Sequence, residues 1–379
     1  MHNMKYIYLV LTLIVGFSTT AQNNKVWTLQ ECVTHALENN ITIQRFENTL
    51  LINEEDIKGA KGQFLPSAGA NMSQSLSFGQ QELFPGSFVN RTSNSTSMSV
   101  NVSQTIFNGF RLTNLYKQAQ LNLDTNELEL NRIKDDISLN VANSYLNVLF
   151  NKERLETAKA QYEFSSKQLQ QVKDLVEAGV QPRVNIYDAE ATLSNDEQSV
   201  TVADNNYTLA LLNLSQLLQV PFEGFKVEVI EIDTPSAALM YNDIKPILNY
   251  ALENRNEIKV AEKNIENAEL STEISKSGFM PSVSASYGLG TNAFYTNLSS
   301  TEESFFNQLN DNKGHSFRLS VNIPIFSRYQ NKVAVAKSKI REATSKLDLD
   351  QAKLTLESNI QRAFTDAQAA LKTYVAAQK

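Results

Sequence analysis

The residue types that carry out chemistry in most enzymes are few and scattered in this chain. Of its three histidines, His2 lies in an N-terminal leader, which leaves only His35 and His315. Together with Cys32, the single cysteine, they form no cluster of ligands with zinc spacing. No serine has the neighbours of a nucleophile elbow and no phosphate-binding glycine motif occurs, although composition alone permits a Ser/His/Asp triad. We therefore predict no catalytic residue, no cofactor, no metal site and no enzymatic activity.

Three single side chains each admit two interpretations. His35 lies in an amphipathic segment, where we expect a packed helix residue and not a ligand. Cys32 lies well past the leader, so we expect a buried small hydrophobe and not a lipidation site. Arg318 lies on the polar side of an alternating segment, so it either lines an aqueous bore and influences ion preference or is a solvated charge.

Composition limits the partner and the compartment. The 379 residues carry 34 Lys and Arg against 41 Asp and Glu without basic clusters, which argues against nucleic acid as a partner. Residues 1–21 combine Lys5, an apolar run at Ile7–Phe17, and small residues at Thr19 and Ala21, as a secretory signal does. The apolar run is shorter than the roughly 20 residues that cross a membrane, and the alternative is an uncleaved anchor.

Four segments, at about 67–78, 97–107, 282–290 and 315–326, alternate between apolar and small polar residues. A period of two predicts β-strands, and about ten such residues per strand are typical of strands that cross a membrane. The apolar positions are Ala68, Ala70, Met72, Leu76 and Phe78, then Met98, Val100, Val102 and Ile106, then Val283, Ala285, Tyr287 and Leu289, and then Phe317, Leu319, Val321, Ile323 and Ile325.

We predict that the apolar face of these strands meets lipid and that the polar face lines a lumen. The lipid-facing candidates are Met72, Leu76, Val100, Val102, Val283, Tyr287, Leu319 and Val321. The lumen-facing candidates are Ser73, Ser75, Ser99, Asn101, Ser284, Ser286, Arg318 and Ser320. A soluble sheet with one wet face gives the same alternation. Two features favour a membrane barrel. The polar face is rich in Ser, Asn and Gly, and the connections at 79–96 and 291–314 are long and carry aromatic residues.

The N-terminal helices have clear boundaries. Thr28 and Glu31 form a capping box, so a helix is expected to begin near Leu29. A break near residues 39–40 separates it from a second helix that runs to about Gly62.

A long helical hairpin is predicted over residues 108–220. Residues 108–179 contain no proline, and their apolar residues recur at spacings of three and four. This pattern predicts one helix of roughly 65–70 residues, about 100 Å long. The chain then turns at Gly179, Val180, Gln181 and Pro182 and returns along a second helix that ends before Pro221.

The chain also contains an internal duplication. Residues 36–70 and 251–285 align without a gap at an offset of 215, with 12 of 35 positions identical. We therefore divide the chain into the signal peptide 1–21, a first repeat 22–235 that ends in a connector, and a second repeat 236–379 with a long helix from 328. By this alignment the second helical tip and its returning helix are missing, and we expect a fragment or truncated product, short by roughly 60 residues or more.

Four strands are too few to close a barrel, because closure needs about eight. Open sheet edges are not tolerated in lipid, so a chain with four membrane strands must oligomerise. Two copies would give eight strands around a side-chain-filled interior, and three would give twelve strands and a possible water-filled bore. The small polar face favours three copies.

The order of motifs resembles a known family. Its segments are WTLQECVTHALENN, FLPS, QTIFNGF and EAGVQPRVNIYDAEATL, followed by FMPS and NIPIF. In the order of these segments the chain resembles the TolC-type outer-membrane efflux protein family. The resemblance covers nearly all of the chain after the leader. It implies a mixed α and β fold: a homotrimer whose twelve-strand β-barrel, with four strands per chain, spans the outer membrane of a Gram-negative bacterium. Long antiparallel α-helical hairpins, forming an α-barrel, would extend through the periplasm.

The resemblance also implies partners and a role. In the family, helical tips meet a periplasmic adaptor protein that couples to an inner-membrane pump, and Gly179, Val180, Gln181 and Pro182 match one tip. The acidic residues that constrict the family's entrance lie near the second tip, so no gate is assigned. The implied function is the passive exit duct of a tripartite efflux or type I secretion system. The alternative is a periplasmic coiled-coil scaffold without a channel, and the sequence does not identify a substrate.

Overall fold

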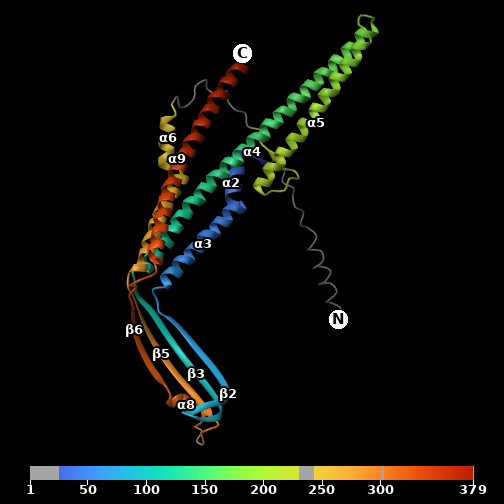
Figure 1. The fold of residues 1–379 in the computed structure, drawn as a ribbon. Helices are drawn as coiled ribbons and strands as arrows, with labels where there is room; N and C mark the ends of the chain where they lie inside the picture. The colour runs from blue at the N-terminus through green and yellow to red at the C-terminus, as the bar shows by residue number, and fades with distance from the viewer. Residues whose placement is uncertain (1–24, 230–242, 300–302, 379) are drawn as a thin grey trace, which may run out of the picture. The chain divides into compact units, whose positions relative to one another are not determined.

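The computed structural model describes residues 25–229, 243–299 and 303–378 (Figure 1). The predicted signal peptide and the end of the predicted connector lie outside the described residues. The chain divides into two compact units. The first unit comprises Met1–Arg45 and Asn131–Ala237, and the second comprises Phe46–Leu130 and Ala238–Lys379.

The first unit begins with α2 (Leu29–Asn39), and the predicted capping box is confirmed. The Thr28 hydroxyl accepts a hydrogen bond from the Glu31 amide at 3.1 Å, and the Glu31 carboxylate accepts one from the Thr28 amide at 3.0 Å. The bond from the Thr28 amide lowers the pKa of the Glu31 carboxyl, because it favours the charged form. Immediately before the helix, β1 (Val26–Trp27) pairs in parallel with β4 (Lys226–Val227).

Tyr145 is the largest fully buried side chain of the described chain. It lies on α4 (Arg111–Glu177), and its hydroxyl donates to the carbonyl oxygens of Glu228 at 2.7 Å and Trp27 at 3.2 Å. Burial raises the pKa of the phenol to about 12, because it disfavours the charged phenolate. Other fully buried residues of this unit come from α2, α3 (Ile41–Gly62), α4 and α5 (Val184–Leu218): Cys32, Ile43, Val141, Val148, Leu214, Ser215 and Leu218.

The 67 residues of α4 confirm the long helix predicted from the sequence. At a rise of 1.5 Å per residue this helix is about 100 Å long. In the first unit its C-terminal part is linked to α5 by a hydrogen bond from the Ser165 hydroxyl to the Asp196 carboxylate and an ion pair between Lys173 and Glu190 at 3.3 Å. These contacts hold the two arms of the predicted hairpin together.

In the second unit, α7 (Asn256–Lys276) packs along α9 (Gln330–Ala377). Polar contacts lie along their interface: the hydroxyls of Ser275 and Ser338 are 2.7 Å apart, and Ser338 is buried. A small apolar cluster joins α6 (Lys245–Asn254), α7 and α9 through Ala251, Ile258 and Leu356.

The duplication is visible in the breaks between helices. Asn40 separates α2 from α3 with φ −64° and ψ 124°, and Arg255 separates α6 from α7 with φ −67° and ψ 132°. Each residue donates its amide to the carbonyl oxygen four residues earlier at 2.9 Å, from Asn40 to Ala36 and from Arg255 to Ala251. The two sites are 215 positions apart, which is the offset of the sequence repeat.

Four strands of the second unit form one antiparallel sheet in the order β2-β3-β5-β6 (Figure 1). The strands are β2 (Ser67–Phe84), β3 (Ser87–Asn108), β5 (Ser282–Thr296) and β6 (Gly314–Asn322). Each strand pair follows a helix and leads into a helix, so the helices of both repeats meet the sheet at the same end.

The strands differ from the predicted segments in four places. Strand β5 continues to Thr296 along β3, so it takes up the start of the connection expected at 291–314. The connection expected at 79–96 is paired strand, because β2 and β3 continue to a tight turn between Phe84 and Ser87. A register shift between Thr105 and Phe107 places Phe107 opposite Val283, so Ile106 is the extra residue of a β-bulge and leaves the predicted alternation. Strand β6 ends at Asn322, so Ile323 and Ile325, predicted to lie on it, fall beyond its end.

The connection after β5 contains a short helix, α8 (Phe305–Asp311), that the sequence did not predict. Beyond Gly290, β5 has no partner strand on the β6 side. There the Gln308 side chain accepts a hydrogen bond from the Phe294 amide at 2.8 Å, and the Asn312 side chain donates to the Asn292 carbonyl oxygen at 2.7 Å. The helix and its C-cap residue therefore satisfy backbone groups on the free edge of β5.

The two junctions from strand to long helix repeat each other at an offset of 219. Two consecutive residues take left-handed conformations at each junction, Gly109 and Phe110 in the first and Arg328 and Tyr329 in the second. An edge-to-face aromatic pair follows the same offset, Phe107 with Phe110 and Phe326 with Tyr329. The duplication is therefore preserved in backbone conformation and in side-chain packing.

Replacing Gly109 by Ala is expected to destabilise the second unit by about 2–3 kcal/mol. Gly109 has φ +64°, and an added Cβ would lie 2.5 Å from the Met280 Cβ and 3.0 Å from the Ser277 carbonyl oxygen. Gly59→Ala in α3 is the matched control, because its Cβ meets nothing within 4 Å and a helical alanine should stabilise by about 0.5–1 kcal/mol. The thermal midpoint of the purified protein should fall for the first variant and not for the second; equal midpoints would contradict the packing of this junction.

Among the described residues, no helix is long and apolar enough to cross a membrane.

Candidate functional site

The strand register sorts the sheet into two chemically distinct faces. Directly opposed residues of antiparallel strands lie on the same face of the sheet. One row across all four strands consists of Ser67, Ser103, Ser286 and Arg318. The neighbouring row, on the opposite face, consists of Ala68, Val102, Tyr287 and Phe317. The sheet therefore has a small, polar face and an apolar face.

All of the residues predicted to line a lumen share the polar face by this register. Their contacts are hydrogen bonds between small side chains: the hydroxyls of Ser73 and Ser97 are 2.7 Å apart, and the Asn101 amide donates to the Ser99 hydroxyl at 3.2 Å. Hydroxyl and amide groups of this kind bind water well and provide no acid–base pair. The face suits contact with water.

All of the residues predicted to meet lipid share the apolar face by the same register. Met72 is 65% exposed and Leu319 is 70% exposed, although both are large hydrophobic residues. Tyr287 and Phe317 pack on each other with ring centroids 4.8 Å apart, and in the described sheet the row ends at β2 on one side and at β6 on the other. A contiguous exposed apolar surface of this kind marks contact with a membrane or another protein. The assignment of the two faces to lipid and lumen stays a prediction.

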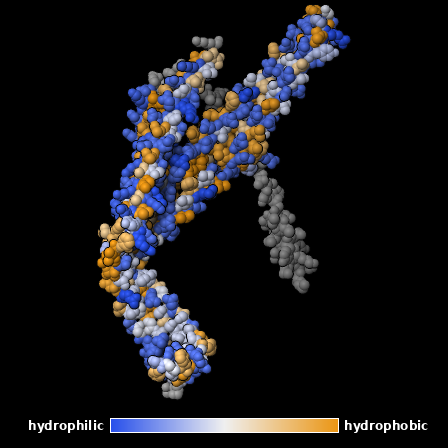
Figure 2. Space-filling view, viewed as in Figure 1, coloured by the Kyte–Doolittle hydropathy of each residue, from blue (hydrophilic) through white to orange (hydrophobic). Residues whose placement is uncertain are grey.

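Hydrophobic side chains also gather where the helices join the strands, as Figure 2 shows. Large hydrophobic residues that are exposed around the two strand–helix junctions are Phe64, Leu65, Phe110, Phe279, Met280, Ile325, Phe326 and Tyr329. Aromatic residues at the end of an apolar strand band are typical of the interface between membrane and water.

The predicted helical tip is a tight Schellman turn. Gly179 takes a left-handed conformation with φ +73°, and its amide donates to the carbonyl oxygen of Val176 at 3.0 Å. The Val180 amide donates to the Leu175 carbonyl oxygen at 2.9 Å, which completes the motif. The turn leaves the Val180 side chain 68% exposed, and the chain passes through Gln181 and Pro182 into α5. The geometry presents an apolar side chain at the end of two long helices, and docking of a partner there stays a prediction.

Two charged residues near the sheet were not among the predicted site residues. Arg91 lies on the polar face, because β3 continues through the segment predicted to be a loop. Its guanidinium lies 5.1 Å from the Phe294 ring centroid and donates to the Gln81 side chain at 2.8 Å. Lys313 lies on the other side, where it lines a hollow of about 380 Å³ with apolar-face residues such as Met72 and Val100. In the sequence, serines at alternate positions before Ser97 could have indicated that the strand extends back to Arg91 and that Arg91 lies on its polar face.

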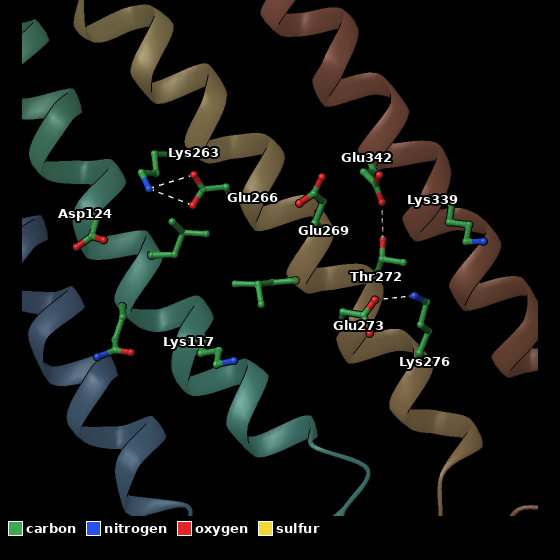
Figure 3. A pocket seen from close by; sticks show the side chains of 13 residues that line it. Lys117, Asp124, Lys263, Glu266, Glu269, Thr272, Glu273, Lys276, Lys339 and Glu342 are labelled. Atoms are coloured by element: carbon green, nitrogen blue, oxygen red, sulfur yellow. Dashed lines mark hydrogen bonds and ion pairs between the residues drawn. The ribbon is translucent and has the colours of Figure 1, made fainter.

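A groove of about 740 Å³ runs between α4, α7 and α9 of the second unit (Figure 3). It is lined by charges of both signs, including Lys117, Asp124, Lys263, Glu266, Glu269, Glu273, Lys276, Lys339 and Glu342. Neighbouring charges pair with each other, as Lys263 does with Glu266 at 3.0 Å. The Lys346 ammonium, by its hydrogen bond, lowers the pKa of the Glu342 carboxyl. Glu266, Glu273 and Glu342 are each paired with a lysine, so the groove is a surface of mixed charge in which several of the carboxylates are ion-paired.

The remaining candidates for chemistry make ordinary packing contacts. The His35 ring meets the Trp27 ring edge-on, with centroids 5.1 Å apart, and His315 lies 2.8 Å from the Tyr287 hydroxyl on the apolar face. Cys32 is fully buried, and burial raises the pKa of its thiol to about 12. Among the described residues, no group of His, Cys, Asp and Glu is arranged to hold a metal ion.

Comparison with protein families matches residues 33–219 and 247–379 to the family described as outer membrane efflux protein. Comparison with curated proteins finds no match.

Several solved structures share the fold of this chain. CusC superimposes with a TM-score of 0.74 at 19% identity, over 92% of this chain and 79% of CusC. VceC of Vibrio cholerae gives a TM-score of 0.72 at 16% identity, over 90% of this chain and 79% of VceC. The CmeC outer membrane channel of Campylobacter jejuni gives 0.69 at 16% identity, over 90% of this chain and 70% of CmeC.

Proposed function

Because this chain belongs to the outer membrane efflux protein family, we propose that it is the passive exit duct of a tripartite efflux or type I secretion system. It is an efflux protein of the outer membrane of a Gram-negative bacterium, with a helical extension in the periplasm. In our proposal three copies form one bore, and a periplasmic adaptor and an inner-membrane pump supply the substrate and the energy.

The observation that carries the proposal is the sheet with one polar face, one apolar face and two free edges. An open edge exposes unpaired backbone groups, which is too costly in hydrocarbon. Pairing the free edge of β6 with β2 of a neighbouring copy removes both edges. Three copies give twelve strands, which leave room for water behind a face of serine, asparagine and glycine.

The height of the apolar band supports insertion in a membrane. On β2 the apolar positions run from Ala68 to Phe78 and are interrupted only at Gln74. At about 3.3 Å per residue and a strand tilt of about 40°, this run covers roughly 25 Å of membrane depth. That height agrees with the apolar band of known membrane barrels, which is about 25 Å.

The proposal is tested by conductance. The purified protein, with trimers verified by their mass in detergent, is added to a planar bilayer, and we expect discrete steps of current. Folded trimers without any pore would refute the proposal. The scaffold hypothesis predicts instead that the native protein is extracted from membranes by salt or carbonate without detergent, and we expect extraction to need detergent.

The helical tip gives a second prediction, about the adaptor. Gly179→Val is expected to weaken export at least several-fold, because valine resists the left-handed conformation that shapes the turn. Trimers and bilayer conductance should persist, since the tip lies far along the chain from the strands. Val180→Ala keeps the backbone of the turn and tests the exposed side chain alone. Normal export by both variants would remove this tip from the docking surface.

A further inference from the structure

We propose that the strand-lined bore attracts negatively charged solutes, and that Arg318 and Arg91 are the residues that do so. The inference rests on the proposed function, because it needs the polar face to line water. The solutes would be anions such as carboxylates, phosphates or sulfonates. Apart from these two arginines, the wall of the bore along the described strands is built of neutral groups.

The charged residues on the polar face of the strands are all positively charged. Along the described strands, the register places Arg91 and Arg318 on this face and places no Asp or Glu there. The strand carboxylate Glu82 falls on the opposite face. The polar face of each chain is therefore purely cationic, although the whole protein has a formal net charge of −7.

Arg318 is positioned to act on a solute. Its side chain is exposed, and within the described residues it forms no ion pair. The residues across from it in the same row are Ser286, Ser103 and Ser67, and the next row on this face contains Gly288 and Gly69. These short neighbours leave the guanidinium uncovered, and its planar fork of donors matches the oxygens of carboxylates and phosphates.

Arg91 forms a second cationic position farther from the helices. It lies 12 positions before Ser103 on β3, which corresponds to roughly 40 Å along the strand. The Phe294 ring and the Gln81 side chain hold the guanidinium, and neither contact neutralises its charge. In a trimer the two residues form two separated rings of three positive charges, and rings of this type are a known means of anion selection.

The size of the effect follows from the width of the bore. Twelve strands about 4.8 Å apart and tilted by about 40° enclose a cylinder roughly 24 Å across between backbones. Long arginine side chains bring their charges within about one Debye length of the axis, which is about 10 Å at 0.1 M salt. We therefore expect removal of the two rings to lower the chloride-to-potassium permeability ratio about two- to threefold at 0.1 M KCl, and more at 0.01 M.

The test compares reversal potentials of single pores in a KCl gradient for the wild type, Arg318→Gln and Arg91→Gln/Arg318→Gln. Lys313→Gln is the matched control, because it removes one positive charge per chain beside the same strand but on the apolar side. The arginine variants should lose permeability for chloride, and the control should not. Arg318→Lys keeps the charge and should keep the preference, which separates charge from folding.

Two measurements on the wild type test the same inference without mutation. The preference for chloride should rise as salt is lowered from 1 M to 0.1 M, and tripolyphosphate should block the current more strongly than uncharged triethylene glycol. A preference for chloride that does not rise as salt is lowered, or a block by tripolyphosphate no stronger than that by triethylene glycol, would overturn the inference, as would equal permeability ratios in the wild type and the double variant. Absence of any conductance would instead contradict the proposed channel.

Discussion

Arginine in place of Val100 or Val321 is expected to reduce the amount of inserted trimer severely, while arginine in place of the adjacent Ser99 or Ser320 is tolerated. Val100 and Val321 lie on the apolar face, and burying an arginine near the middle of the bilayer costs about 2–4 kcal/mol per chain. In the proposed trimer three chains share one barrel, so the penalty applies three times to each assembled pore.

The serine variants are close controls, because each differs from its partner by one position on the same strand. A shift of one residue moves a side chain to the other face of the sheet. We would measure the fraction of protein that is protected from protease in vesicles and extracted only with detergent. Equal losses for the valine and serine variants would refute the assignment of faces. Small losses for all four would favour the soluble scaffold.

Tyr145→Ala is expected to give the second large effect, a loss of about 3–5 kcal/mol of local stability in the first unit. The ring is fully buried, and its hydroxyl joins α4 to the carbonyl oxygens of Trp27 and Glu228. The substitution leaves a cavity and removes both hydrogen bonds. Tyr145→Phe keeps the ring and should cost only about 0.5–1.5 kcal/mol, because the Trp27 carbonyl oxygen still accepts a hydrogen bond from the Glu228 amide at 2.9 Å.

Hydrogen exchange of the full-length protein measures this effect locally. Amides of α2 and of the β1–β4 pair should exchange about 100- to 4,000-fold faster in Tyr145→Ala, because each 1.4 kcal/mol of lost opening energy is a factor of ten. Tyr187→Ala in α5 is the control, since this tyrosine is 69% exposed and should change exchange little. Exchange rates in Tyr145→Ala that match those of the control would show that the tyrosine does not anchor these strands.

Long helices and their boundaries could be predicted from the sequence with good accuracy. The capping box at Thr28 and Glu31, the uninterrupted helix to Glu177 and the turn at Gly179 all depend on residues within a few positions of one another. The physical chemistry of caps, turns and glycine conformations is local, so the amino-acid order contains it directly. The two faces of the strands were also predictable, because alternation reports which side of a strand is apolar.

The lengths and neighbours of the strands were decided only by the tertiary structure. The pairing of β2 with β3 extends strand structure through 79–96, where apolar alternation fades and the sequence indicated a loop. The bulge that displaces Ile106 exists because β3 must pair with β5, about 180 positions later in the chain. Local pattern does not determine which distant strand satisfies a backbone group.

In the candidate site, too, some features could be predicted from the sequence and others were decided only by the tertiary structure. The sequence alone determined that Arg318 stands among small polar residues on an alternating strand. Only the register across β2, β3, β5 and β6 brings Arg318 and Arg91 onto one face without an acidic residue. Tyr145 is a further example, because its partners Trp27 and Glu228 are 118 and 83 positions away. Periodicity and capping act over a few residues and can be read along the chain, whereas charge balance on a surface and satisfaction of buried groups depend on contacts that form when distant segments fold together.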